Sequence, residues 1–312
     1  MAWKAVDGKR YLYRKIAGIA KSLGPESDAT RATYLRFSEG KAAAKARSES
    51  LVETLRKMAP VNRAMGIGRV PRTTARILRR LDGLGLLGSV FRVVGTHALY
   101  AYERMAAGHF DSDTVATLDI DLLYDARGTL KLLSADIRNS GLVGILQRVD
   151  KSFEPLASGH FRAANNKGFM VDLITPSTKN PATRKFRSRI GDRSDDLAAA
   201  EIDGLTWLES SPSITAVVID EHGFPLRMIV PDPRYYAAHK AWLASREDRP
   251  ADKSRRDRRQ AEAVAAMIKT TMPKMRFDDP ALNALPEAVR ALGLALERDT
   301  TSVDDRPDED DI

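Results

Sequence analysis

Phe91-Arg92-Val93-Val94-Gly95-Thr96 and Leu118-Asp119-Ile120-Asp121-Leu122-Leu123 are the two runs from which the architecture of this chain is best predicted. The first predicts a short apolar strand that stops at Gly95 and leads into a helix reaching about residue 107. The second predicts a strand with carboxylates at positions i and i+2. Because side chains alternate across a strand, these two carboxylates share one face, while Ile120 and Leu122 face a core. Adjacent like charges repel, and a divalent cation such as Mg²⁺ between them would remove that cost.

These runs resemble the nucleotidyltransferase fold of the DNA polymerase beta superfamily. The family pattern is an apolar residue, two small residues opening a helix, and Asp-x-Asp on the next strand. Here Gly95-Thr96 and Asp119-Ile120-Asp121 stand at those positions, with Thr96 replacing a small residue and with a long gap to Asp119. A third carboxylate on a later strand belongs to the pattern, and Asp172 in Phe169–Ile174 suits it. An ion pair of Asp172 with an arginine is the structural alternative.

The resemblance implies an α/β fold, namely a mixed-sheet nucleotidyltransferase core with N-terminal and C-terminal helical regions. Bacterial abortive-infection and toxin-like transferases also have a lysine-bearing helix followed by an Arg-Asp helix that closes the nucleotide site. Lys240, Lys253 and Arg256-Asp257 match that pattern. Since Asp257 also continues an apolar stripe with Ala261, Val264 and Ile268, an ion pair with Lys240 or an arginine is the alternative.

The expected domains are a helical region over 1–88, a core over 89–232, C-terminal helices over 233–298 and an acidic, disordered tail over 299–312. Helices are expected over 1–22 and over 28–58, and Pro60 should end the second. Two hairpins are expected in the core, one over 161–174 and one over 214–230. The run Gly83–Gly88 has the spacing G-x-G-x-x-G, but it follows a predicted helix and precedes a strand. A dinucleotide-binding loop needs the opposite order.

The charge distribution is uneven along the chain. The net charge is +8, and residues 299–312 carry seven acids and one arginine, so the remainder has a net charge of +14. Such a body suits a polyanion, such as RNA or a nucleoside triphosphate, although solubility alone is the simpler explanation. A basic helix face (Lys41, Lys45, Arg47) and a basic loop (Arg184, Lys185, Arg187, Arg189) are candidate contacts, with plain solvent exposure as the alternative for both.

Several classes of protein are disfavoured by composition. The chain has no cysteine, which excludes thiol catalysis, disulfides and cysteine-based zinc sites. No apolar run is long enough for a membrane span, and Met1-Ala2-Trp3-Lys4 does not open an apolar signal segment. A cytoplasmic protein without a membrane partner is therefore expected. The five histidines are scattered, and His97 is expected to be a packed core residue rather than a catalyst.

The resemblance implies a metal-dependent enzyme that moves a nucleoside monophosphate from an NTP to an acceptor, releasing pyrophosphate. Asp119, Asp121 and Asp172 would hold Mg²⁺ or Mn²⁺, while Gly95, Thr96, Lys240, Lys253, Arg256 and Asp257 would form the nucleotide site. RNA, tRNA, a protein or a small molecule could be the acceptor, and the oligomeric state is left open. A transferase-like module that binds nucleic acid or regulates without catalysis, its aspartates being structural, is the alternative.

Overall fold

The computed structural model describes residues 1–16, 19–125, 135–157, 160–178 and 194–299, with side chains from 139 onward in the third segment. The chain divides into two compact units, Met1–Ala64 and Met65–Ile312. The expected acidic tail, beyond residue 299, and the basic loop with Arg184, Lys185, Arg187 and Arg189 lie outside the described residues. No helix in the described segments is both long and apolar enough to cross a membrane.

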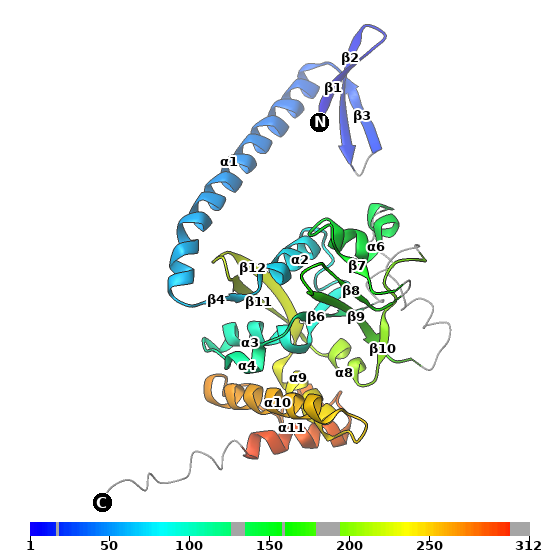
Figure 1. Cartoon of the computed structure of the whole chain (residues 1–312). Coiled ribbons are helices and arrows are strands. Elements are labelled where there is room, and N and C mark those ends of the chain that lie inside the picture. Colours follow the sequence, from blue (N-terminus) through cyan, green and yellow to red (C-terminus); the bar gives the residue numbers. More distant parts are fainter. Residues whose placement is uncertain (17–18, 126–134, 158–159, 179–193, 300–312) are drawn as a thin grey trace, which may run out of the picture. The chain divides into compact units, whose positions relative to one another are not determined.

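The first unit is a small sheet followed by one long helix (Figure 1). Strands β1 (Ala2–Val6), β2 (Lys9–Ile16) and β3 (Ile19–Pro25) pair antiparallel in that order. Helix α1 (Asp28–Ala64) follows. Leu12 is fully buried, and the Trp3 ring lies 5.7 Å from the ring of Tyr34 in α1. One face of the sheet therefore packs against the start of the helix.

The prediction of helices over residues 1–22 is wrong, because this segment forms the strands β1 to β3. The decisive local signal is Asp7-Gly8, whose φ angles of 48° and 74° are those of a tight hairpin turn. Helix α1 also continues past Pro60 to Ala64. Proline withdraws one hydrogen bond from the carbonyl of Arg56, but that residue is exposed and water can replace the bond.

The second unit is built on a mixed sheet, as the resemblance implied. Its strand order is β5-β6-β9-β8-β7, and β10 also pairs with β9. Among the described strands of this sheet, only the β6–β9 and β9–β10 pairs are parallel. The strands are β5 (Phe91–Val94), β6 (Asp119–Tyr124), β7 (Glu154–Pro155), β8 (Arg162–Ala164), β9 (Met170–Pro176) and β10 (Ala200–Ile202). The expected strand 89–94, the expected Asp-x-Asp strand and the first hairpin are thereby confirmed.

A second, three-stranded sheet has the order β12-β11-β4. Its strands are β4 (Gly68–Val70), β11 (Ser213–Asp220) and β12 (Pro225–Pro231). Strands β11 and β12 form the second predicted hairpin, whereas β4 pairs parallel to β11. Arg79 fixes the hairpin to α2, because its guanidinium bonds Asp220 at 2.8 Å and donates to the carbonyls of Phe224 and Pro225.

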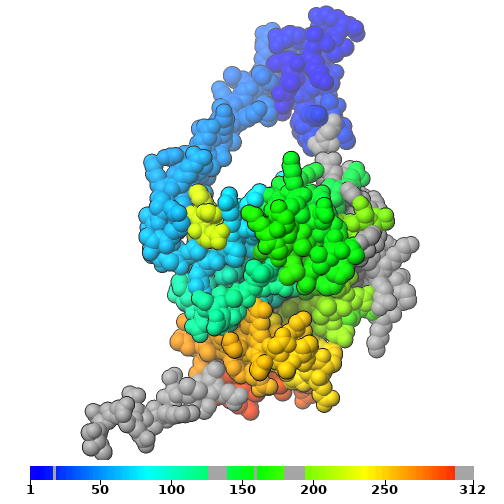
Figure 2. Space-filling model, viewed as in Figure 1, coloured from blue at the N-terminus to red at the C-terminus, as the bar shows by residue number. Residues whose placement is uncertain are grey.

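The helices of this unit have the following bounds: α2 (Arg72–Gly83), the 3-10 turn η1 (Gly95–Ala98), α3 (Leu99–Ala106), α4 (Ser112–Val115), α6 (Ala135–Gln147), α8 (Leu205–Ser210), α9 (Pro233–Ser245), α10 (Ala251–Thr271), η3 (Pro280–Leu282) and α11 (Glu287–Asp299). Gly83–Gly88 does follow a helix. Helix α9 packs against α10 and α11, and Figure 2 shows the α10 atoms, in orange, along one side of the unit.

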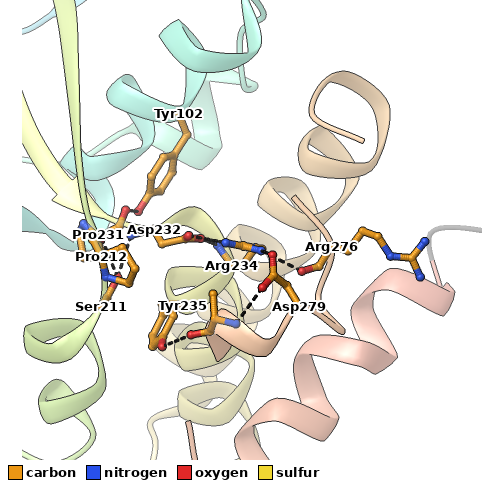
Figure 3. A network of polar contacts seen from close by, with 10 residues as sticks. Tyr102, Ser211, Pro212, Pro231, Asp232, Arg234, Tyr235, Arg276 and Asp279 are labelled. Carbon is orange, nitrogen blue, oxygen red and sulfur yellow. Dashed lines mark hydrogen bonds and ion pairs between the residues drawn. The ribbon is translucent and has the colours of Figure 1, made fainter. Parts of the chain in front are cut away.

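A polar network fixes the start of α9 (Figure 3). Asp232 caps the helix by accepting from the Arg234 backbone N–H at 2.9 Å, and its carboxylate also pairs with the buried Arg234 guanidinium. Arg234 reaches Asp279 and the carbonyl of Arg276, while the Tyr235 hydroxyl donates to the carbonyl of Ala281 at 2.7 Å. The chain before η3 is thus tied to α9, whose other residues line the candidate site.

Candidate functional site

The two carboxylates of the Asp-x-Asp run lie on one face of β6, as alternation requires. Ile120 and Leu122 between and after them are fully buried on the opposite face. In the strand register, Asp121 stands opposite Val94 of β5 on one side and Asp172 of β9 on the other. Asp119, Asp121 and Asp172 all line one cavity of about 340 Å³. The sheet therefore brings together the three carboxylates that the sequence singled out.

Gly95 is required by the position of Asp121. Its φ of +61° lies in the left-handed region, and a Cβ at this residue would lie 1.9 Å from Asp121 Oδ2. Any side chain here would push the carboxylate away. Gly95 was predicted to belong to the nucleotide site, and the structure shows that it makes room for Asp121.

Thr96 follows at the start of η1, and its hydroxyl is held by α10. Thr96 Oγ1 accepts from Gln260 Nε2 at 3.1 Å and from Arg256 Nη2 at 3.3 Å. Arg256 also donates to the carbonyl of Ala116. These contacts join the turn after β5 to the helix that carries the predicted Arg-Asp pair. Thr96, like Gly95 and Arg256, lines the cavity.

Asp172 pairs with an arginine, which was the structural alternative for this residue. Arg162 Nε and Nη2 each lie 2.6 Å from a different oxygen of the carboxylate, in a bidentate arrangement. The two residues stand opposite each other across the β8–β9 pair. Arg162 lines the same cavity and was not among the predicted site residues. Its local sequence carries no signal, because only the register of the β8–β9 pair places it opposite Asp172.

The carboxylates create a locally anionic floor. The pKa of Asp121 is raised to about 7, first by burial and then by the charges of Asp119 and Asp172, despite Lys240 and Arg162 nearby. The negative charges around Asp121 attract any cation that can enter the cavity. In the described segments, no three or more His, Asp or Glu side chains converge on a metal-sized site. Mg²⁺ is commonly held by one or two carboxylates, with phosphates and water supplying other oxygens, and the Asp119–Asp121 pair fits that pattern.

A basic wall of the same cavity comes from α9, α10 and the turn between them. Lys240 Nζ lies 2.6 Å from Asp257 Oδ1, and Arg249 binds the other oxygen of Asp257 at 2.6 Å. The ion pair with Lys240 that was the structural alternative for Asp257 is present, and Arg249 is a second partner that the sequence did not single out. Lys253 and Arg256 line the cavity beside them.

The remaining wall is apolar. Val94 is the last residue of β5, Ile174 lies within β9, and Leu205 and Leu208 come from the short helix α8. Tyr236 of α9 adds an aromatic ring, and its hydroxyl donates to Gln260 Oε1 at 3.2 Å. One cavity thus combines carboxylates, cations and an apolar surface.

His97 is a packed core residue, as expected. It is fully buried, and its Nε2 lies 2.8 Å from the Thr74 hydroxyl. Burial lowers its pKa to about 4, which keeps the ring neutral at physiological pH. It is not a lining residue of the cavity.

The raised pKa of Asp121 predicts an unusual pH dependence of stability in the metal-free protein. Between about pH 4 and pH 7 the folded chain binds this proton more tightly than the unfolded chain, so the free energy of unfolding falls as pH rises and levels off above pH 7. Asp121→Asn removes this dependence. Thermal melts in EDTA should show the variant gaining melting temperature over the wild type from pH 5 to pH 8. The exposed Glu262→Gln on α10 is the control, and a constant difference for Asp121→Asn would contradict the prediction.

Comparison with known proteins bears on this site. No curated protein and no solved structure matched the chain. The sequence model of a family described as nucleotidyltransferase matches residues 72–286, which is more than half of the chain and runs from α2 to the segment after η3. The match includes all three carboxylates, Gly95 and the basic wall. The chain therefore belongs to the nucleotidyltransferase family.

Proposed function

We propose that the protein transfers a nucleoside monophosphate from an NTP to an acceptor hydroxyl, with release of pyrophosphate, and that the reaction requires Mg²⁺ or Mn²⁺. The observation that carries this proposal is one cavity lined both by three carboxylates and by lysine and arginine side chains. A metal–triphosphate complex has the complementary pattern, because the cation seeks carboxylates and the phosphate oxygens seek lysine and arginine.

Asp119 and Asp121 would hold the metal ion, which supplies charge neutralisation on the triphosphate. Lys253 and Arg256 would bind phosphate oxygens directly. Lys240 is engaged by Asp257, so it contributes positive charge to the same wall while also fixing the helix pair. Thr96 would be oriented toward the triphosphate by Gln260 and Arg256.

Asp172 remains in the proposal as the third carboxylate, able to bind metal and to accept a proton from the acceptor. Without a bound metal or NTP, Arg162 compensates the negative charge of Asp172. The same guanidinium can bind a phosphate oxygen when Asp172 is engaged by a cation. The apolar wall formed by Val94, Ile174 and α8 would accept the nucleobase, since ligand sites combine such surfaces with a few polar groups.

The proposal also covers the branch of the family, the nucleotide donor, the acceptor and the cellular compartment. A lysine helix (Lys240) followed by a helix with Arg256-Asp257 supports the abortive-infection or toxin-like branch. ATP or another NTP would be the donor, RNA, tRNA, a protein or a small molecule the acceptor, and the cytoplasm the compartment because NTPs are found there. The Asp172–Arg162 and Asp257–Lys240 pairs favour the second candidate, a binding module without catalysis, because they satisfy these charges internally.

Label transfer separates the two candidates. The purified chain is incubated with each α-labelled NTP, Mg²⁺, and cellular RNA or protein, and pyrophosphate release is followed in parallel. The enzyme should incorporate label from at least one NTP and lose this activity in EDTA. A binding module should show a melting-temperature shift with Mg²⁺-NTP but no label and no pyrophosphate. Neither a shift nor label with any NTP would overturn the nucleotide site itself.

A further inference from the structure

The two faces of the β1–β3 sheet are chemically different. Trp3, Arg10 and Leu12 share the face toward α1, since Trp3 packs near Tyr34, Arg10 pairs with Glu26, and Leu12 is fully buried. By alternation, Tyr11 and Tyr13 point to the opposite face. Lys4 Nζ lies 5.3 Å from the centre of the Tyr13 ring, which places this lysine on the same face.

The face opposite α1, which we call the tyrosine face, combines aromatic rings with positive charge. Strand register places Lys4 beside Tyr11, and Lys9 and Lys15 lie on the same face of β2 as the tyrosines. The three lysines are exposed and both tyrosines are partly exposed. The tyrosine face is therefore solvent-exposed and positively charged.

Small neighbours leave room over the rings. Tyr13 is flanked in the register by Ala2 on β1 and Ser22 on β3, and Lys15 is flanked by Ala20. None of these side chains is large enough to cover a tyrosine ring. Apart from Lys4, whose Nζ lies 5.3 Å from the ring centre, the register neighbours of Tyr13 leave its ring open to a planar ligand.

The positive charge of residues 1–25 indicates which kind of ligand the tyrosine face binds. Residues 1–25 contain six basic side chains and one acid, Asp7. A second copy of the sheet would bring lysine against lysine, which disfavours self-association through this face. A polyanion with flat apolar rings meets both features at once, because its phosphates pair with lysines and its bases stack on tyrosines.

We propose that the tyrosine face binds a single-stranded polynucleotide, with bases stacked on Tyr11 and Tyr13 and phosphates near Lys4, Lys9 and Lys15. Binding here needs neither metal nor NTP. That the bound strand is also the acceptor of the transferred nucleotide rests on the proposed function. A double helix is disfavoured, because its bases are stacked on one another and are not available to the rings.

Fluorescence anisotropy with the full-length chain tests this proposal. The probes are a labelled 12-nucleotide oligouridylate, the corresponding deoxy strand and an RNA duplex of equal length, all in EDTA so that metal-dependent binding does not contribute. The wild type should bind the single strands at least tenfold more tightly than the duplex. RNA and DNA strands of equal affinity indicate recognition of bases and phosphates alone, whereas preference for RNA adds the 2′-hydroxyl.

The variants separate stacking from charge. Tyr11→Val/Tyr13→Val keeps residues suited to a strand but removes both rings, so affinity should fall at least tenfold, whereas Tyr11→Phe/Tyr13→Phe should retain binding. Lys4→Gln/Lys15→Gln should lower the salt slope of log affinity by about 1.4. Arg56→Gln/Arg63→Gln makes the same charge change at exposed positions of α1 and should alter affinity less than twofold.

The outcomes are distinct from those of the transfer assay. Wild-type affinity in both the valine and the lysine variants would overturn the proposal, as would equal losses in the α1 control. Failure of the single strands to bind, with a dimer seen by sizing, would assign the face to self-association instead. Strand binding in EDTA by a chain that transfers no label would leave this proposal standing and overturn only the proposed reaction.

Discussion

Asp119→Asn is expected to reduce nucleotidyl transfer by about a thousandfold or more, because it removes a charge needed to hold the metal ion at the reacting phosphate. The fold should survive. Asp119 is partly buried and its Oδ1 accepts a hydrogen bond from the Thr117 hydroxyl, which an asparagine oxygen can also accept. Removing one of two adjacent negative charges also relieves repulsion with Asp121. The melting temperature without metal should therefore equal or exceed that of the wild type.

Label transfer and thermal melts with and without Mg²⁺-NTP measure both effects. Asp113→Asn is the matched control, because this exposed carboxylate lies on α4, just before the Asp-x-Asp strand, and is not a lining residue of the cavity. It should retain wild-type activity. Wild-type activity in Asp119→Asn would remove the metal role from this residue.

Asp257→Ala is expected to lower the free energy of unfolding by roughly 3–5 kcal/mol, because removing one member of a buried ionic group leaves its partners uncompensated. Asp257 is 2% exposed and accepts from Lys240 at one oxygen and Arg249 at the other. It therefore anchors the contact between α9 and α10. Urea unfolding followed by circular dichroism measures the loss, with the exposed Asp252→Ala on the same helix as control.

Lys240→Met should cost less stability than Asp257→Ala, since Arg249 still pairs with the carboxylate. If Lys240 also adds positive charge to the basic wall of the cavity, Lys240→Met should raise the KM for NTP. Lys253→Met offers the contrast, because this exposed residue lines the cavity without an ion pair among the described residues. It should raise KM without changing the unfolding free energy. Equal stability of Asp257→Ala and the wild type would refute a structural role for this ionic group.

The core could be predicted from local patterns. Asp119-Ile120-Asp121-Leu122 has a period of two, and a strand with that period must place both carboxylates on one face. The two hairpins were also predictable, because turn residues separate apolar runs of strand length. At the N-terminus, Tyr11-Leu12-Tyr13 after Asp7-Gly8 has the same signals, but interspersed basic residues hid the alternation and led to the wrong prediction of helices.

Pairings between distant side chains were less predictable. Arg162 and Arg249 are two of the chain's many basic residues, and nothing in their local sequence distinguishes them. Arg162 meets Asp172 because of the β8–β9 register, and Arg249 meets Asp257 because the chain turns between α9 and α10. The reason for Gly95 was also inaccessible, because the clash with Asp121 depends on how β5 and β6 lie beside each other.

The parallel pairing of β4 with β11 constrains how the chain can fold during its synthesis. Arg79 and Pro225, which meet beside this sheet, lie 146 positions apart. At typical translation rates, roughly 7–30 s pass between the emergence of α2 and that of its hairpin partner. During this interval the fully buried side chains of α2, including Ile77, Leu78 and Leu81, lack their final cover. Nascent chains stalled before residue 213 should therefore recruit ribosome-associated chaperones, and chains extended beyond residue 231 should release them.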